Sequence, residues 1–167
     1  MARIVLVIAP KDFRDEELFH AKEELEKAGN ETAIAGKKKG KAIGSRGGKA
    51  EIAMELREVR EKDFDAIVFI GGGGAEIYFN DAKALGLAKE FAAAGKIVAA
   101  ICIAPSILAN AGLLKGKRAT CFSSEAENLK SKGTDYTGKA VEVDGKIITA
   151  NGPAAAREFG RKIAEMV

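Results

Sequence analysis

The sequence contains few of the residues that build metal centres or disulfide frameworks. Its 167 residues include one histidine, two cysteines, three prolines and no tryptophan. One histidine and two cysteines cannot form a zinc finger, a zinc ribbon or a three-histidine catalytic zinc site. Two cysteines are also too few for the disulfide framework of a small secreted domain. We therefore expect neither a metal site nor a bound cofactor.

Long apolar runs and a strong excess of one charge are missing as well. The apolar run 96–103 is far shorter than a membrane span, and residues 1–8 lack the long apolar region of a signal peptide. The net charge is only +3, and no aromatic residue is interleaved with the basic cluster 37–41. We therefore expect a cytoplasmic protein that binds neither a membrane nor a nucleic acid.

What the sequence does contain is an alternation of short apolar runs and amphipathic segments. Continuous apolar runs are typical of parallel strands, because both faces of a parallel sheet are covered. We predict strands at 3–9, 32–35, 65–70, 96–101 and 118–122. We predict helices at 15–28, 81–94, 103–111, 125–132 and 154–166.

Two turn signals complete the predicted fold. Asp144-Gly145 predicts a hairpin between 141–143 and 147–149. The glycine-rich segment 41–52 predicts a second hairpin, apart from the main sheet. The pattern as a whole predicts one α/β domain over 1–167, a three-layer sandwich with a mainly parallel sheet.

Cys102 is the first candidate for chemistry. It follows the apolar strand 97–101 and precedes a predicted helix, so it occupies a strand-to-helix turn. Such a turn pushes a nucleophile out of the sheet, and the N–H groups that follow favour its thiolate. The alternative is an inert cysteine at a tight junction, since free cysteine is among the residues most often buried.

Three further features lie near predicted strand ends or helix starts. The run Gly71 to Gly74 follows a strand, and its amides fit an oxyanion pocket better than a nucleotide site, or they serve only a connector. Glu17 lies in the first turn of a predicted helix, where the dipole favours acids. His20 follows one turn later, and a lone histidine on a helix is usually structural or exposed. If Glu17 faces the crevice, however, we expect His20 at its edge as an accessory residue.

Two segments match a known family. Residues 99–106, Ala-Ala-Ile-Cys-Ile-Ala-Pro-Ser, resemble the nucleophile elbow of the ThiJ/PfpI superfamily, and residues 144–153 resemble its closing segment. The resemblance covers nearly the whole chain. It implies a flavodoxin-like fold, one ThiJ/PfpI domain over 1–167, and a homodimer or a higher homo-oligomer.

The resemblance also implies roles for individual residues. Cys102 matches the reactive cysteine of the family, and Glu17 matches the acidic residue that hydrogen-bonds its sulfur. Gly72 and Ile103 match the positions whose backbone amides form the oxyanion pocket. Glu76 aligns with an acidic residue that, in the protease branch, reaches into the neighbouring subunit.

Two departures from the family pattern alter the expected chemistry. The protease branch has histidine directly after the nucleophile, where this chain has Ile103. The branch of the parkinsonism-associated protein has histidine near the end of the next strand, where this chain has Cys121. Without a histidine base, efficient peptide hydrolysis is not expected.

Cys121 suggests a second kind of chemistry. If it occupies the place of the family histidine, its sulfur should lie close to Cys102, and the two could form a reversible disulfide. Glutamine is absent and Lys and Glu are abundant, a bias typical of heat-adapted proteins, in which intracellular disulfides occur. The alternative is two separate reduced thiols.

Two functions follow from these observations. In the first, Cys102 and Glu17 form a cysteine-dependent hydrolase or lyase that acts on a peptide or on small reactive carbonyls such as methylglyoxal. In the second, the protein is a non-enzymatic redox sensor or stress-protective protein that uses reversible oxidation of Cys102. The segment 76–79 is the candidate for an exposed apolar interface, or else a helical turn packed on its own core.

Overall fold

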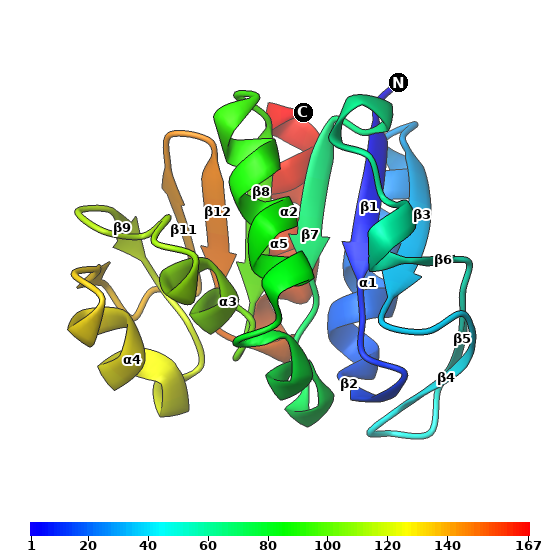
Figure 1. Cartoon of the computed structure of the whole chain (residues 1–167), viewed down its shortest axis with the longest axis horizontal. Helices are drawn as coiled ribbons and strands as arrows, with labels where there is room; N and C mark the ends of the chain where they lie inside the picture. The colour runs from blue at the N-terminus through cyan, green and yellow to red at the C-terminus, as the bar shows by residue number, and fades with distance from the viewer.

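The computed structural model describes residues 1–167 and contains a seven-stranded main sheet between two layers of helices (Figure 1). The strand order is β11-β12-β8-β7-β1-β3-β6. Every neighbouring pair is parallel except β11 with β12. The strands are β1 (Arg3–Val7), β3 (Glu31–Gly36), β6 (Met54–Glu55), β7 (Ala66–Phe69), β8 (Ile97–Ile101), β11 (Val141–Asp144) and β12 (Ile147–Ala150).

Each face of the main sheet packs against its own set of helices. Helices α1 (Asp15–Lys27) and α5 (Ala156–Met166) cover one face with a cluster of 22 buried residues. Helices α2 (Ala82–Ala93), α3 (Pro105–Asn110) and α4 (Ala126–Ser131) contribute to a cluster of 27 buried residues on the other face. The prediction of a three-layer α/β sandwich with a mainly parallel, flavodoxin-like sheet is therefore confirmed.

The central strands read as continuous apolar runs because both of their faces are covered. All five residues of β8 are buried, and they alternate between the two clusters. Val98 and Ala100 face α2 and α3, whereas Ala99 and Ile101 face α1 and α5. When both faces of a sheet are covered, the residues that point to either face are apolar, and the strand is apolar at every position.

A second, three-stranded sheet lies beside the main one. It contains β2 (Lys11–Phe13), β4 (Gly40–Gly44) and β5 (Lys49–Ile52) in the order β2-β4-β5. The antiparallel pair β4–β5 confirms the predicted hairpin. Asp15 holds its turn, since the carboxylate accepts hydrogen bonds from Arg46 N at 2.9 Å and Gly48 N at 2.6 Å.

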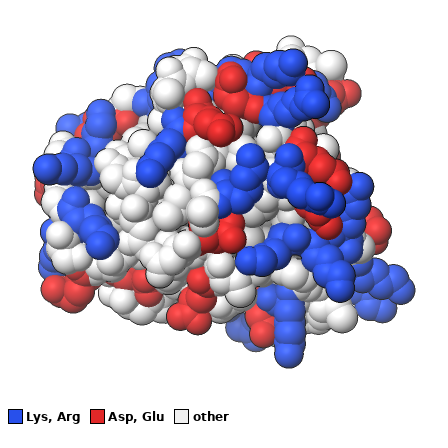
Figure 2. Space-filling model, viewed as in Figure 1, with Lys and Arg blue, Asp and Glu red and all other residues white.

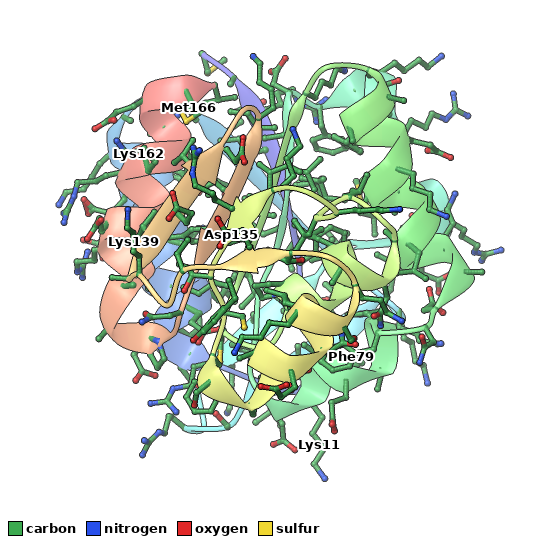
Figure 3. All side chains as sticks on the ribbon, turned by 90° about the vertical axis from the view of Figure 1, so that its left-hand side faces the viewer. Lys11, Phe79, Asp135, Lys139, Lys162 and Met166 are labelled. Atoms are coloured by element: carbon green, nitrogen blue, oxygen red, sulfur yellow. The ribbon has the colours of Figure 1, made fainter.

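The predicted strand at 118–122 is wrong in length and in place. Only β9 (Arg118–Ala119) forms, and it pairs with β10 (Asp135–Tyr136) outside the main sheet, as Figure 3 shows around Asp135. The next residue leaves the ladder because Thr120 N donates to Thr149 Oγ1 at 3.0 Å. Cys121 therefore does not lie at the end of a main-sheet strand.

The surface carries charges of both signs. In Figure 2, acidic side chains lie among the basic ones on the right-hand side and along the rim, and the area left of the centre carries few charges. The segment 76–79 is only partly exposed: Ile77 is 45% exposed, whereas Tyr78 is buried and donates its hydroxyl to Ile8 O at 2.7 Å. None of the helices has the length and apolarity needed to cross a membrane.

Candidate functional site around Cys102

The site lies at the carboxyl ends of β7 and β8, beside the first turn of α1. Cys102 follows β8 directly, and its backbone has a φ of 65°, which is rare for a residue with a side chain. Cys102 N donates to Ala150 O at 2.9 Å, and Cys102 O accepts from Phe122 N at 2.7 Å. These two bonds fix the turn in a conformation that is costly by itself.

Glu17 brings a carboxyl group to the cysteine from α1. Its side chain is completely buried, and Oε1 accepts a hydrogen bond from Gly71 N at 2.9 Å. Oε2 has no nitrogen or oxygen partner, and the Cys102 thiol interacts with the same carboxyl group. A buried acid with one free oxygen beside a thiol can take up or deliver a proton there.

Burial governs the ionisation of both groups. It raises the pKa of Glu17 to about 7, while interactions with Cys102 and with Gly71 N–H oppose that shift. It also raises the pKa of Cys102 to about 12, and the charge of Glu17 adds to the effect. The backbone N–H groups of Gly72 and Ile103 act in the opposite direction, since they donate toward the sulfur.

Glycines allow the backbone amides to approach this closely. A Cβ atom on Gly71 would lie 2.6 Å from Glu17 Oε1, and one on Gly72 would lie 2.3 Å from Arg14 N. Gly72 also has a φ of 98°, which favours glycine. Gly71 and Gly72 are thus required by the contacts of the loop after β7 with Glu17 on α1 and with Arg14 just before it.

The structure brings together four of the predicted site residues, namely Cys102, Glu17, Gly72 and Ile103. The roles assigned to these four residues stay predictions.

The other three predicted residues lie apart from this group. Glu76 is exposed on a short 3-10 helix (Gly73–Tyr78), and its intersubunit role stays a prediction. His20 lies half-buried on α1 and lines a surface cavity. Cys121 is buried in the cluster on the opposite face of the sheet from Cys102, and both thiols are free.

Sequence reasoning missed two residues beside the site. Arg14 N donates to Gly71 O at 2.9 Å, and the positive charge of Arg14 lowers the pKa of Glu17. Phe122 is 45% exposed and lies beside Gly152, just after β12. Neither residue type stands out in a sequence in which charges are abundant and a single aromatic residue carries no periodic signal.

The metal-ligating residue types are dispersed in the fold. No group of three or more His, Cys, Asp or Glu side chains is placed to hold a metal ion. The chemistry that this arrangement itself offers is a thiol, a proton carrier and two amide donors around one point.

Comparisons with known proteins agree with this geometry. The chain is 42% identical to an uncharacterized protein of Methanocaldococcus jannaschii over 169 residues, covering 99% of this chain and 82% of that protein. It is 31% identical to a deglycase of Pyrococcus abyssi, covering 98% of each. The crystal structure of a ThiJ/PfpI domain protein from Brachyspira murdochii superposes with a TM-score of 0.96 at 35% identity, covering 98% of this chain and 94% of that one.

The family resemblance seen in the elbow and in the closing segment is thereby confirmed. Residues 2–166 match the DJ-1/PfpI family across both segments. The protein belongs to the DJ-1/PfpI family.

Proposed function

We propose that the protein is a cysteine-dependent deglycase that acts on adducts of small reactive carbonyls such as methylglyoxal. The observation that carries the proposal is the buried pair of Glu17 and Cys102, with the amides of Gly72 and Ile103 directed at the sulfur. The names of its relatives support the substrate class, since the protein of P. abyssi is called a deglycase.

The ionisable groups of Cys102 and Glu17 suit addition of the thiol to a carbonyl carbon. Glu17, with a pKa of about 7, exists in both protonation states near neutral pH. As the Cys102 sulfur forms a bond to the carbonyl carbon, the thiol proton passes to the Glu17 carboxylate and the π electrons of the carbonyl move to its oxygen. The amides of Gly72 and Ile103 stabilise that oxygen.

The same proton can then leave with the product. Glu17 returns it to the amine as the carbon–nitrogen bond breaks, which leaves the methylglyoxal fragment on the Cys102 sulfur as a hemithioacetal. A proton shift between the two oxygen-bearing carbons of that fragment converts it to a lactoyl thioester. Water then cleaves the carbon–sulfur bond, which releases lactate and restores the thiol. Peptide hydrolysis demands more, because an amide nitrogen is a poor leaving group and this site has no histidine base. His20 is the sole histidine, and it lies outside the contacts of Cys102.

Turnover of a defined adduct tests the proposal. Methylglyoxal adducts of Nα-acetyllysine are incubated with wild type, Cys102→Ser, Glu17→Gln and the control Cys121→Ser, and lactate and free amine are measured. A fluorogenic peptide is assayed in parallel. We expect lactate and amine from wild type and Cys121→Ser only. Equal rates for wild type and Cys102→Ser would contradict the proposal.

Reversible oxidation of Cys102 is the second candidate function. The amides of Gly72 and Ile103 would stabilise a negatively charged sulfur oxide as well as a thiolate. Cys121 packs in the other core cluster, and both thiols are free in the structure. This second function requires that the turnover assay gives no deglycase activity. The protein is then treated with peroxide and analysed by mass spectrometry with and without reductant, which distinguishes a reversible Cys102 oxide from a disulfide.

A further inference from the structure

The peptide group between Cys102 and Ile103 forms contacts on both of its sides. Its N–H, which belongs to Ile103, donates toward the Cys102 sulfur. Its carbonyl oxygen, which belongs to Cys102, accepts the N–H of Phe122 at 2.7 Å. A trans peptide group is planar, so its C=O and its N–H point in opposite directions. The hydrogen bond from Phe122 therefore fixes the direction of one of the two amide donors at the sulfur.

Phe122 lies in a segment that is outside every sheet. Before Phe122, the chain is held by the buried Thr120, whose N–H donates to Thr149 Oγ1 at 3.0 Å. After Phe122, residues 123–124 are exposed, and the first side chain that bonds to another element is that of Glu125. Because the Phe122 ring is exposed as well, the position of its N–H depends on these two anchors.

Glu125 anchors the second end of the segment to α3. Its Oε1 accepts a hydrogen bond from Ser106 Oγ at 2.7 Å, and Ser106 is completely buried. Ser106 lies four residues after Cys102, and Glu125 lies three residues after Phe122. Two hydrogen bonds thus join the nucleophile elbow to this segment, one from Phe122 N to Cys102 O and one from Ser106 to Glu125.

The hydroxyl proton of Ser106 has a defined place. Asn128 Nδ2 donates to Ser106 Oγ at 3.0 Å and to Asn110 Oδ1 at 3.1 Å, between the neighbouring helices α3 and α4 (Figure 1). An amide nitrogen only donates, so the hydroxyl directs its own proton to Glu125. Asn110 Nδ2 in turn donates to Phe79 O at 2.8 Å. Because each side chain of this network has its partners, the bond from Ser106 to Glu125 has one orientation.

Glu125 acts toward the Cys102 site as a hydrogen-bond acceptor. Its two carboxylate oxygens accept from Ser106 and, at 3.0 Å, from the exposed Ser124. Its charge acts on a different thiol, since it raises the pKa of Cys121, which has no part in the proposed reaction. The feature of Glu125 that reaches Cys102 is therefore the hydrogen bond to Ser106.

We propose that Ser106 and Glu125 are positioning residues for the Cys102 site, because their hydrogen bond holds Phe122 N on the Cys102 carbonyl. Through the planar peptide group, that bond directs the Ile103 N–H at the sulfur and at the carbonyl oxygen of the substrate. This role deepens the proposed deglycase function and rests on it for the effect on turnover. Without the bond between Ser106 and Glu125, the peptide group is free to rotate, and the strained backbone of Cys102 relaxes.

Three variants separate the hydrogen bond from the charge. Glu125→Ala and Ser106→Ala each remove the bond, so either one carries the test if the other does not fold. Glu125→Gln removes the charge and keeps an oxygen that accepts from Ser106. Ser124→Ala is the matched control, because its hydroxyl bonds to the same carboxylate but lies exposed within the same segment. Thermal melting checks the folding of each variant.

Hydrogen exchange and alkylation test the positioning without turnover. In the two alanine variants at Glu125 and Ser106, the Phe122 amide should exchange at least about tenfold faster, whereas the Val98 amide in the main sheet should be unchanged. Alkylation of Cys102 by iodoacetamide at a fixed pH should slow by about threefold or more, since one amide donor no longer favours the thiolate. Mass spectrometry assigns the label to Cys102. Both measurements should give wild-type values in Glu125→Gln.

Turnover shows whether the positioning serves the reaction. In both alanine variants, kcat for the methylglyoxal adduct of Nα-acetyllysine should fall about tenfold with KM within about twofold, because the amide donor acts on the transition state. Glu125→Gln should stay within about threefold of wild type. The double alanine variant should lose no more than either single variant, since both remove the same bond.

The outcomes that contradict the positioning role differ from those that contradict the deglycase. Equal acceleration of exchange at Phe122 and Val98, unchanged or faster alkylation of Cys102, or equal effects of Ser124→Ala and Glu125→Ala would overturn the positioning role. Normal turnover in both alanine variants also refutes it and keeps the deglycase. Altered exchange and alkylation, with no turnover by wild type, refutes the deglycase and keeps the positioning role.

Discussion

The two cysteines of this protein have similar burial and different neighbours. Cys102 and Cys121 are 8% and 1% exposed, and burial raises the pKa of each to about 12. Around Cys102 there are two backbone N–H donors and a buried carboxyl group. Around Cys121 the structure offers apolar side chains and the negative charge of Glu125, which opposes a thiolate.

The difference shows that burial alone does not decide whether a thiol is reactive. Desolvation disfavours both thiolates to a similar degree. Only Cys102 has groups that compensate when charge develops, and only Cys102 has a partner that can exchange a proton with it. Reactivity at this site is therefore a property of Gly72, Ile103 and Glu17 as much as of the sulfur.

The largest expected effect is the difference in turnover between the Cys102→Ser and Cys121→Ser variants. Cys102→Ser should lower kcat/KM for a methylglyoxal adduct by about a thousandfold or more, because the nucleophile is lost. Cys121→Ser should change it less than twofold. The measurement is initial rates of lactate formation with equal amounts of folded protein. A comparable loss in both variants would break the comparison between the two thiols.

The second largest effect is expected on stability after substitution in the glycine loop that follows β7. This loop lies beside Cys102 and not beside Cys121. Gly72→Ala should lower the free energy of unfolding by about 3–5 kcal/mol, because the φ of 98° and contacts with Arg14 and Asp12 leave no room for a methyl group. Gly73→Ala is the matched control, with open space at its Cβ, and should stay within about 0.5 kcal/mol. Urea unfolding of both variants measures the difference.

The pH dependence of stability isolates Glu17. The folded state raises its pKa from 4.5 to about 7, so between these values the folded protein binds more protons than the unfolded chain. Stability contributed by Glu17 is thus lost as pH rises through this window, by at most about 3 kcal/mol. The free energy of unfolding of wild type minus that of Glu17→Gln should fall from pH 4.5 to 7.

The neighbouring Glu16 provides a control of opposite sign. The hydrogen bond from Arg14 lowers the pKa of Glu16, so its stabilising contribution is lost as pH falls. Difference curves of the same sign for Glu17→Gln and Glu16→Gln would show that the burial of Glu17 does not control its ionisation.

The smallest expected effect concerns the packing around Cys121. Cys121→Ala removes one buried sulfur atom from the apolar cluster, and we expect a loss of about 1 kcal/mol in unfolding free energy with activity unchanged. Thermal melting and lactate assays on the same preparation provide both values. A loss of activity with stability intact would give Cys121 a part in the chemistry that its surroundings do not suggest.

Much of the fold could be predicted because burial on two sides leaves a plain mark in the sequence. The strand before Cys102 is apolar at every position, and the hairpin around Asp144-Gly145 carries its turn residues. The segment 118–122 is also predicted as a strand, yet only Arg118–Ala119 pairs. Hydrogen bonds from Thr120 to distant groups end that strand, and no local pattern reveals them.

In the candidate site, Cys102 was easier to predict than the residues that surround it. The strand-to-helix turn marks Cys102, but Glu17 looks in the sequence like Asp15 and Glu16 beside it, since a first turn favours acids in any environment. Its complete burial depends on the loop at Gly71, more than fifty residues away in sequence.

The unusual φ of Cys102 also sets which half of the protein receives the thiol. Side chains of β8 alternate, so that Val98 and Ala100 point to the same side as Cys121, and a regular strand would send position 102 there too. The left-handed residue breaks this parity and places the sulfur with Ala99 and Ile101, on the side of Glu17. One backbone torsion thus separates two thiols that simple alternation would have placed in a common core.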